Sequence, residues 1–307
     1  MSDRESVNIR YRDLPRICGS RPILIAGPTA AGKSQLALQL ASRFDGVVIN
    51  SDALQVYSCW RILTARPTAH EEKLVPHRLY GHVEHDRRYS VGDWIADVAR
   101  TLDSLRGRRP VIVGGSGLCF EALTRGLAPI PPIAPEISER YESLLERRGP
   151  QSFVEDLLRL DPEGCRKLDL ENNVRVRRAW EVLHSTGRSI GAWHSVPVTP
   201  LIEVDSAIPI VLECDAGLLA ARIHERLRRM VDEGALVECQ RMMDRWDPAL
   251  PSCQAHGARQ FIAHLRNSCS LAQAIDEAAT VTRQYAKRQR SWHRTRMKKW
   301  RRVGVEW

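Results

Sequence analysis

The first 130 residues alternate short apolar runs with segments of helical periodicity. The apolar runs at 23–26, 47–49 and 110–113 have the length of buried strands, and the first and third lead directly into glycine. Apolar residues recur at helical spacing over 30–44 and again over 90–107. This alternation predicts an α/β fold with a parallel sheet flanked by helices, whose ligand lies at the carboxyl ends of the strands.

The middle of the chain, residues 131–200, has the pattern of helices alone. Four prolines between residues 126 and 135 mark its beginning, and Gly-Pro at 149–150 and Asp-Pro at 161–162 divide its helices. No segment within it is typical of a strand. We therefore predict an all-helical insertion into the core.

Strand character returns at 207–214, where we expect the sheet to resume. Asp215 is placed to cap a helix that extends to about Glu233, and the remainder up to Trp300 is mostly helical in pattern. The chain is thus predicted to have three segments. They are the first part of the core (1–130), the helical insertion (131–200), and a segment that completes the core and ends in a basic helix (201–307).

Composition indicates a folded, cytoplasmic protein with reduced thiols. Hydrophobic residues make up 43% of the 307, enough for a core, and no stretch approaches the roughly 18 to 20 apolar residues of a membrane span. Residues 1–21 lack the apolar segment of a secretory signal. The eight cysteines are scattered without a CxxC pair, which predicts neither a disulfide framework nor a zinc site. They are Cys18, Cys59, Cys119, Cys165, Cys214, Cys239, Cys253 and Cys269.

The net charge of +9 comes from one segment. Ten of the 46 Lys and Arg residues lie between Arg283 and Arg302 without an acid among them, so the rest of the chain has 36 basic against 37 acidic residues, or −1. Such a segment is either a solvated cationic helix or a surface that binds the phosphates of a nucleic acid. Both interpretations remain open on charge alone.

Residues 27–34 have the sequence GPTAAGKS, which matches the phosphate-loop pattern GxxxxGK[ST] between a strand and a helix. The glycines let backbone N–H groups surround a diphosphate, and the helix N-terminus adds partial positive charge. Lys33 would reach the outer phosphate, and the Ser34 hydroxyl would hold Mg²⁺. The predicted di- or triphosphate site comprises Gly27, Pro28, Thr29, Ala30, Ala31, Gly32, Lys33 and Ser34.

Other motifs narrow the phosphate chemistry. The chain has no Asn-Lys-x-Asp, which argues against a GTPase, and no Asp-Asp pair, which argues against isoprenoid chain-elongating enzymes. Glu213 ends an apolar strand and is either a Walker B acid or an ordinary strand terminus.

Polar residues follow the second and third strands. Asp52 is placed to act as a base or a metal partner, and Ser116 in a Gly-Gly-Ser-Gly turn to exchange hydrogen bonds with a ligand. For each, the alternative is plain turn chemistry.

Four sequence blocks, spread over nearly the whole chain, carry a resemblance to a known family. They are GPTAAGKS at 27, NSDALQVY at 50, VGGSGLCFEAL at 113 and TRQYAKRQRSW at 282. Together they closely resemble the tRNA dimethylallyltransferases, the tRNA isopentenyltransferase family of bacteria and eukaryotic organelles. Weaker similarities include 172–181 and 222–234, and the resemblance extends from about 23 to 294.

The resemblance implies a prenyl transfer. The exocyclic amine of the adenosine at tRNA position 37, just 3′ of the anticodon, attacks dimethylallyl diphosphate and expels diphosphate. The phosphate loop, with Mg²⁺ at Ser34, would neutralise the leaving group. Asp52 would take the proton of the amine, and Ser116, where the family has threonine, would contact it. The loop is of a nucleotide-binding type, but this reaction requires no ATP.

The resemblance also implies that a monomer binds the tRNA anticodon stem-loop, without a membrane. The helical insertion would clasp the stem-loop, and an RxxR helix that contains Arg175 would approach both the diphosphate and the tRNA. The basic segment would follow phosphates or line the reaction tunnel. The residues implied in tRNA binding are Asp52, Ala53, Leu54, Gln55, Ser116, Arg175, Arg178, Arg283, Lys287, Arg288 and Arg290.

The chain departs from the family pattern at several positions. Cys119 replaces an aromatic residue, HGARQ at 256–260 replaces the common IGYKE, and Arg78 and His293 stand where histidine and phenylalanine are usual. Two other functions compete with prenyl transfer. One is a small-molecule kinase that uses ATP at the same loop, and the other is a non-catalytic RNA-binding protein in which Asp52 is structural.

Overall fold

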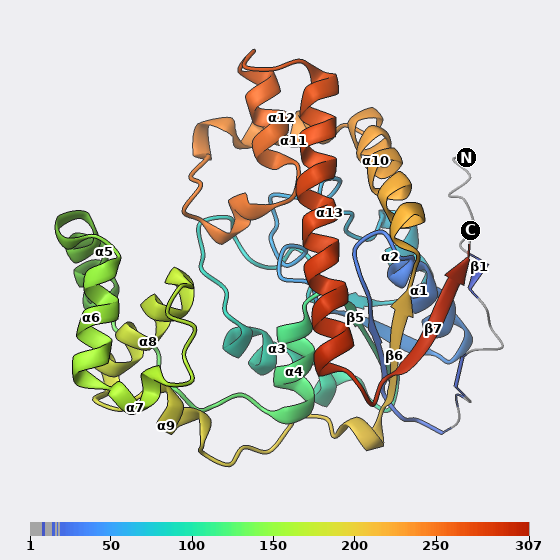
Figure 1. The fold of residues 1–307 in the computed structure, drawn as a ribbon. Coiled ribbons are helices and arrows are strands. Elements are labelled where there is room, and N and C mark those ends of the chain that lie inside the picture. Colours follow the sequence, from blue (N-terminus) through green and yellow to red (C-terminus); the bar gives the residue numbers. More distant parts are fainter. Residues whose placement is uncertain (1–7, 10–13, 16, 18, 307) are drawn as a thin grey trace. The chain divides into compact units, whose positions relative to one another are not determined.

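The core contains a seven-stranded sheet in the order β1-β7-β6-β2-β5-β3-β4 (Figure 1). The structure is a computed structural model, and it describes residues 8–9, 14, 15, 17 and 19–306. Only the pairing of β1 with β7 is antiparallel among the described strands, which confirms the predicted parallel α/β sheet. The strands are β1 Asn8–Ile9, β2 Ile23–Ala26, β3 Gly46–Asn50, β4 His77–Arg78, β5 Arg109–Gly114, β6 Ile208–Glu213 and β7 Arg301–Glu306.

Helices cover both faces of the sheet, which explains why its central strands are continuous apolar runs. Ile25 packs with α1 (Lys33–Arg43) on one face. Leu24 points to the other face, where it packs with α3 (Val91–Ser104) and α4 (Gly117–Arg125). Both side chains are fully buried.

Two details differ from the sequence predictions. The first helix was expected from residue 30 but begins at Lys33, because Ala30 and Gly32 adopt left-handed backbone angles (φ 63° and 84°). The chain up to Trp300 was expected to be mostly helical, and the strand that follows it, at 301–306, was not predicted. There the chain forms β7 beside β6, with Val303 and Val305 buried among charged neighbours.

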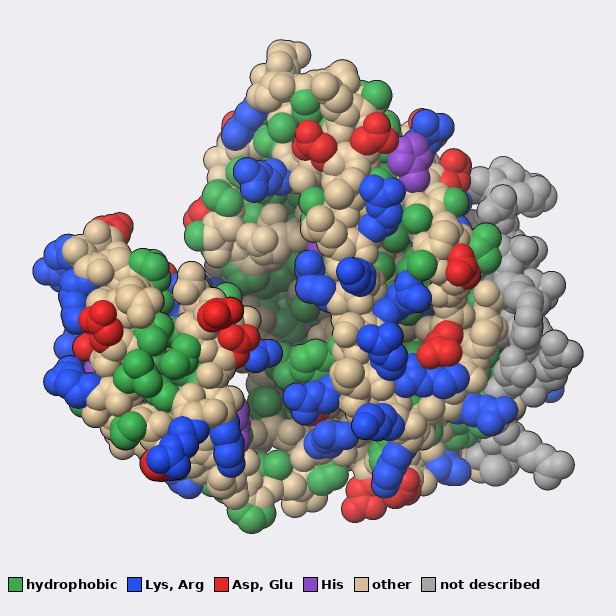
Figure 2. Space-filling model, in the orientation of Figure 1, with side chains coloured by type: hydrophobic (Ala, Val, Ile, Leu, Met, Phe, Trp, Pro, Cys, Tyr) green, Lys and Arg blue, Asp and Glu red, His purple; other side chains and the backbone are tan. Residues whose placement is uncertain are grey.

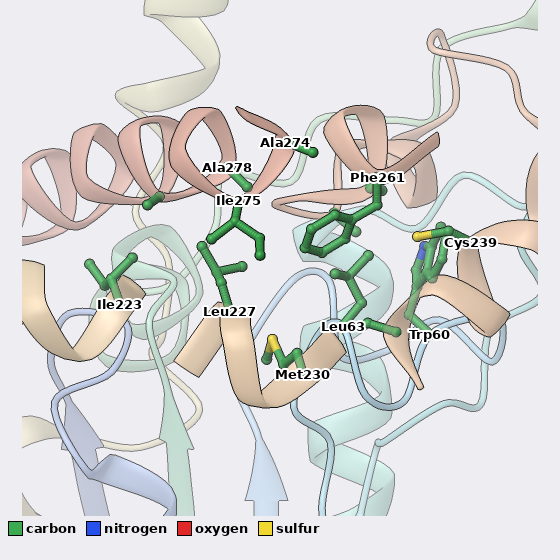
Figure 3. Packing of buried hydrophobic residues seen from close by; sticks show 14 of the residues in the cluster. Trp60, Leu63, Ile223, Leu227, Met230, Cys239, Phe261, Ala274, Ile275 and Ala278 are labelled. Atoms are coloured by element: carbon green, nitrogen blue, oxygen red, sulfur yellow. The ribbon is translucent and has the colours of Figure 1, made fainter. Parts of the chain in front are cut away.

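The C-terminal helices and the loop after β3 share one apolar cluster (Figure 3). Leu227 and Met230 of α10 meet Phe261 of α12 and Ile275 of α13, and Trp60 and Leu63 enter from the loop. This cluster fixes the loop and helices that surround the phosphate loop. The helices are α10 Ala216–Asp232, α11 Ala235–Met242, α12 Ala258–Leu265 and α13 Leu271–Arg296.

The chain separates into two compact units, Met1–Thr124 with Leu201–Trp307 and Arg125–Pro200. The second is helical and has its own core, in which the rings of Tyr141 and Phe153 stack at 4.1 Å and Trp180 meets Phe153 edge-on at 5.4 Å. Its helices are α5 Pro135–Arg148, α6 Gln151–Leu160, α7 Pro162–Cys165, α8 Asn173–Thr186 and α9 Ile190–His194. The two predicted X-Pro breaks separate these helices: Gly-Pro at 149–150 lies between α5 and α6, and Asp-Pro at 161–162 lies between α6 and α7.

The remaining elements are short, namely α2 Ala69–Leu74, η2 Val204–Ser206, η3 Met243–Arg245 and η4 Pro251–Gln254. The seven cysteines within the described part of the chain are free thiols, and Cys18 lies outside the described residues. Among the helices that the structure describes, none has the length and apolar character needed to cross a bilayer.

Candidate active site at the phosphate loop

The loop 27–34 turns sharply between β2 and α1. Ala30 and Gly32 have left-handed backbone angles, and turns that contain such residues are typical of loops whose backbone N–H groups bind anions. The residue before α1 is Gly32, which has no side chain to cap the first turn, and the N–H groups of a helix start are available to a ligand. The Ser34 side chain at the start of the helix is exposed.

Lys33 lies folded over this loop. Its Nζ donates to the Pro28 carbonyl oxygen at 2.7 Å. Burial lowers the pKa of Lys33 to about 8, while the Asp52 carboxylate opposes this fall and the positive charge of Arg226 adds to it. A diphosphate bound beside this ammonium would stabilise its charged form and raise the pKa again, so the site favours an incoming anion.

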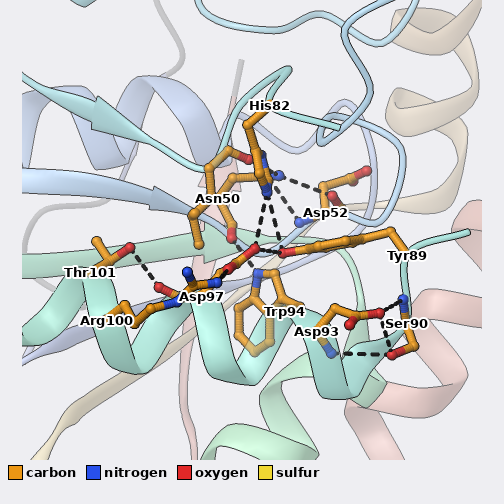
Figure 4. A network of polar contacts seen from close by, with 11 residues as sticks. Asn50, Asp52, His82, Tyr89, Ser90, Asp93, Trp94, Asp97, Arg100 and Thr101 are labelled. Carbon is orange, nitrogen blue, oxygen red and sulfur yellow. Dashed lines mark hydrogen bonds and ion pairs between the residues drawn. The ribbon is translucent and has the colours of Figure 1, made fainter. Parts of the chain in front are cut away.

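Asp52 lies in the turn after β3, where Asn50 and Leu54 hold it (Figure 4). Its Oδ1 accepts the N–H of Leu54 at 2.9 Å, so the turn role of this carboxylate is present. Its Oδ2 lies toward the β5–α4 loop, 3.7 Å from where a Cβ on Gly115 would be. Asp52 and Lys33 line the same cavity. The carboxylate therefore stabilises its own turn through Oδ1 and also borders the phosphate loop.

Ser116 lies in the β5–α4 loop, next to the turn of Asp52. Its N–H donates to the Ser51 carbonyl at 3.4 Å, and its Oγ accepts the N–H of Cys119 at 3.4 Å. The hydroxyl therefore caps α4 and retains its own proton for donation. Cys119 itself is buried on α4, and burial raises the pKa of its thiol to about 11.

A cavity of about 100 Å³ joins the predicted residues Lys33, Ser34, Asp52 and Gln55. A larger cavity of about 700 Å³ shares Lys33 and Ser34 and is lined by further arginines. Sequence reasoning missed several of the lining residues. They include Arg66, Tyr80, Arg222, Arg226, His256 and Tyr285.

Four of the missed residues, Arg222, Arg226, His256 and Tyr285, lie in the C-terminal part of the chain. Arg222 and Arg226 lie one turn apart on α10. Both fall within 222–234, a segment with weaker similarity to the family, which was the available sequence signal. The rings of His256 and Tyr285 are 4.3 Å apart, and burial lowers the pKa of His256 and raises that of Tyr285. These four side chains bring positive charge and aromatic rings to the cavities.

Gln55, expected to contact tRNA bases, uses its amide hydrogens within the protein. Nε2 donates to the carbonyls of Thr64 at 2.8 Å and Ala65 at 3.0 Å, which ties the Asp52 turn to the loop 64–68. Ala53 and Leu54 complete this turn, and Leu54 lines the smaller cavity. Ala53 is exposed.

The expected RxxR pair lies on α8, in the helical unit. Arg175 forms an exposed ion pair with Asp169 at 3.5 Å, and Arg178, one turn along, is exposed as well. Asn172 caps this helix by accepting the N–H groups of Val174 and Arg175. Neither arginine lines the two cavities of the core.

The basic residues of α13 lie on one side of that helix. Arg283, Lys287, Arg288 and Arg290 are exposed, while Thr282, Ala286, Gln289 and His293 are buried. Figure 2 shows Lys and Arg side chains gathered over the region that α13 crosses. The structure therefore confirms a helix, with its cationic face in solvent.

Glu213, a possible Walker B acid, has another partner. Its carboxylate pairs with Arg302 of β7 at 2.8 Å, and it lines neither cavity. The interpretation as an ordinary strand terminus is the one that this geometry favours.

Comparisons with known proteins identify the family of this chain. A family model described as IPP transferase matches residues 55–296. The chain is 49% identical over 291 residues to a tRNA dimethylallyltransferase of Cereibacter sphaeroides, covering 95% of this chain and 91% of the relative. It is 46% identical over 294 residues to a tRNA dimethylallyltransferase of a Ruegeria species, covering 96% and 99%.

Solved structures share the fold. A tRNA isopentenylpyrophosphate transferase of Bacillus halodurans superimposes with a TM-score of 0.65 at 29% identity, covering 93% of this chain and 90% of that one. A eukaryotic dimethylallyltransferase acting on tRNA gives a TM-score of 0.78 at 27% identity, covering 90% and 70%.

Proposed function

The chain belongs to the IPP transferase family, and from this premise we propose how its site transfers a dimethylallyl group. The donor is dimethylallyl diphosphate, and the acceptor is the exocyclic amine of the adenosine at tRNA position 37, 3′ of the anticodon. The observation that carries the proposal is that one cavity is bordered by the phosphate loop and by Asp52. Leaving-group stabilisation and proton removal, the two requirements of this transfer, are therefore adjacent.

The phosphate loop binds the diphosphate of the donor. The N–H groups turned inward at 30–34 and the Lys33 ammonium contact its oxygens, and Arg226 adds positive charge from α10. Charge on the diphosphate increases as its bond to the allylic carbon breaks, so these donors act most strongly in the transition state. Arg175 of the helical unit is proposed as a further diphosphate contact, on the family resemblance alone.

A Mg²⁺ ion fits this site as a partner of the diphosphate rather than as a protein-bound metal. The exposed Ser34 hydroxyl is the one protein ligand, and within the described residues no three His, Cys, Asp or Glu side chains cluster to hold an ion. Mg²⁺ is commonly bound by few protein oxygens together with substrate phosphates and water. When bound, it would neutralise charge on the leaving diphosphate.

Asp52 and Ser116 act on the acceptor. The amine attacks the allylic carbon, the carbon–oxygen bond to diphosphate breaks, and Asp52 takes the proton that the new carbon–nitrogen bond displaces. Ser116 contacts the amine and orients it. The adenine must leave its stack to reach this cavity, as with other enzymes that act on bases.

The exposed arginines and lysines supply the tRNA contacts. We assign Arg283, Lys287, Arg288 and Arg290 of α13 to phosphates of the anticodon stem-loop, because their face is cationic and solvated. Ala53, Leu54 and Gln55 lie beside Asp52, and we assign them to the bases around the target adenosine. Arg175 and Arg178 are proposed as contacts from the helical unit.

Two further properties complete the proposal. The family resemblance is the ground on which we propose a monomer as the active form. The free thiols support a reducing compartment, and we propose the cytoplasm.

Mass spectrometry tests the function directly. An unmodified anticodon stem-loop RNA is incubated with the protein, Mg²⁺ and dimethylallyl diphosphate, with the donor omitted in the control. We expect a gain of one C₅H₈ unit on the adenosine 3′ of the anticodon. No gain with this donor, together with phosphate transfer from ATP to a small molecule, would contradict the proposal and support the kinase.

A further inference from the structure

Gln289 of α13 connects two loops that are far apart in sequence. Its Oε1 accepts the N–H of Thr29 in the phosphate loop at 2.8 Å, and its Nε2 donates to the Gly115 carbonyl in the β5–α4 loop at 3.0 Å. Gln289 is 5% exposed, the hydrogen bond to Gly115 is buried, and the one to Thr29 is partly buried. One amide therefore spans the gap between the two loops.

Two glycines make this close approach possible. A Cβ on Gly115 would lie 2.1 Å from Gln289 Nε2, and a Cβ on Gly117 would lie 2.1 Å from the Trp292 ring. Neither glycine has a positive φ. Glycine is therefore required at these positions because a side chain would collide with α13, and not because of the backbone conformation. The GGSG turn and the C-terminal helix are thus complementary surfaces.

The bridge joins the two halves of the proposed reaction. Thr29 belongs to the loop that binds the diphosphate, whereas Gly115 precedes Ser116 and lies near Asp52 Oδ2. The reacting carbon and nitrogen must approach to about 3 to 3.5 Å, and a misplacement of about 1 Å costs roughly 10²-fold in rate. The spacing of these loops sets that approach.

We propose that Gln289 is a positioning residue that holds the phosphate loop and the Ser116 loop at the separation needed for transfer. The inference rests on the proposed function. A glutamine is required because one side must accept a hydrogen bond while the other donates. Glutamate lacks the donor, and asparagine is one methylene too short to reach both loops.

The first test is the variant Gln289→Met, which keeps length and removes both hydrogen bonds. We expect kcat to fall about 10- to 100-fold, with KM for both substrates within about threefold, because each substrate still meets its own loop. The control is Gln284→Met, an exposed glutamine on the same helix. An unchanged kcat, or a loss confined to one KM, would overturn the proposal.

The second test approaches the bridge from the other loop. Gly115→Ala places a methyl group where the Gln289 amide lies, so it should lower kcat about 10-fold or more in the wild-type background. In a Gln289→Ala background the space is open, and the same substitution should change kcat less than about twofold. Additive losses would overturn the proposal, and this comparison holds even if Gln289→Met folds poorly.

The activity of the wild-type protein distinguishes failure of this inference from failure of the proposed function. If it forms no prenylated RNA, the proposed function has failed. If it is active and Gln289→Met has the same kcat, only the positioning role has failed.

Discussion

Asn50 holds the backbone of Asp52 from both sides. Its Oδ1 accepts the Asp52 N–H at 2.9 Å and its Nδ2 donates to the Asp52 carbonyl at 3.0 Å (Figure 4). Nδ2 also donates to the Leu79 carbonyl, and Trp94 Nε1 donates to the Asn50 carbonyl at 2.8 Å. The candidate base is therefore fixed by a fully buried residue two positions away.

Replacing Asn50 with alanine should lower both stability and turnover. The change leaves the Asp52 N–H and two carbonyls without their partner, and a buried unpaired group costs about 1 to 3 kcal/mol. We expect the free energy of unfolding to fall by about 2 kcal/mol or more and kcat to fall about 10-fold or more through the displaced carboxylate. Urea unfolding and steady-state turnover measure the two effects, and an unchanged kcat would show that Asn50 does not position Asp52.

Asp52→Asn should abolish most turnover while the protein still binds tRNA. The amide oxygen can still accept the Leu54 N–H, so the turn is kept and only the base is lost. General-base catalysis contributes about 10²- to 10⁴-fold, and a single-turnover assay should show a loss of that order. Loss of the negative charge also removes what raises the pKa of Lys33, so that pKa should fall further.

A surface carboxylate provides the control. Asp45→Asn removes an acid that is 81% exposed and pairs with Arg108, and its turnover should stay within about twofold of wild type. A filter-binding assay should give both variants tRNA affinities within about threefold of wild type. If Asp52→Asn turns over normally, Asp52 serves the turn alone.

Lys287→Ala should weaken tRNA binding and make it less sensitive to salt. Each phosphate contact releases counterions, so the slope of log affinity against log salt concentration should become shallower by about 0.7 to 0.9. The control is Lys73→Ala, an exposed lysine of α2. Identical slopes for wild type and Lys287→Ala would show that this face of α13 makes no phosphate contact.

The phosphate loop and Asp52 could be predicted from sequence because their chemistry is local. A loop motif specifies its own turn, and Asp52 follows a recognisable strand. The contributions of Arg226 and Gln289 depend on how helices nearly 200 residues or more along the chain pack against that loop, which periodicity does not specify. β7 was not predicted because its two buried valines lie among charged residues in the sequence. They are buried only because β7 pairs with β6.

His293 should make the protein less stable in mild acid. The residue is 1% exposed, and neither ring nitrogen has a hydrogen-bond partner among the residues that the structure describes. Burial lowers its pKa to about 4 from an ordinary value of 6.5, and the positive charges of Lys33 and Arg302 contribute. Below pH 6.5 the unfolded chain binds a proton that the folded one refuses, so stability is full above pH 6.5 and falls as the pH drops toward 4.

The variant His293→Phe isolates this effect, because it keeps an aromatic ring and removes the titration. Between pH 7.5 and 5 the wild type should lose about 2 kcal/mol more unfolding free energy than the variant, measured by urea unfolding. His70→Gln, on the exposed surface of α2, is the control and should keep the wild-type pH dependence. If wild type and His293→Phe lose the same unfolding free energy, the folded protein accommodates the protonated ring, and burial does not lower the pKa of His293.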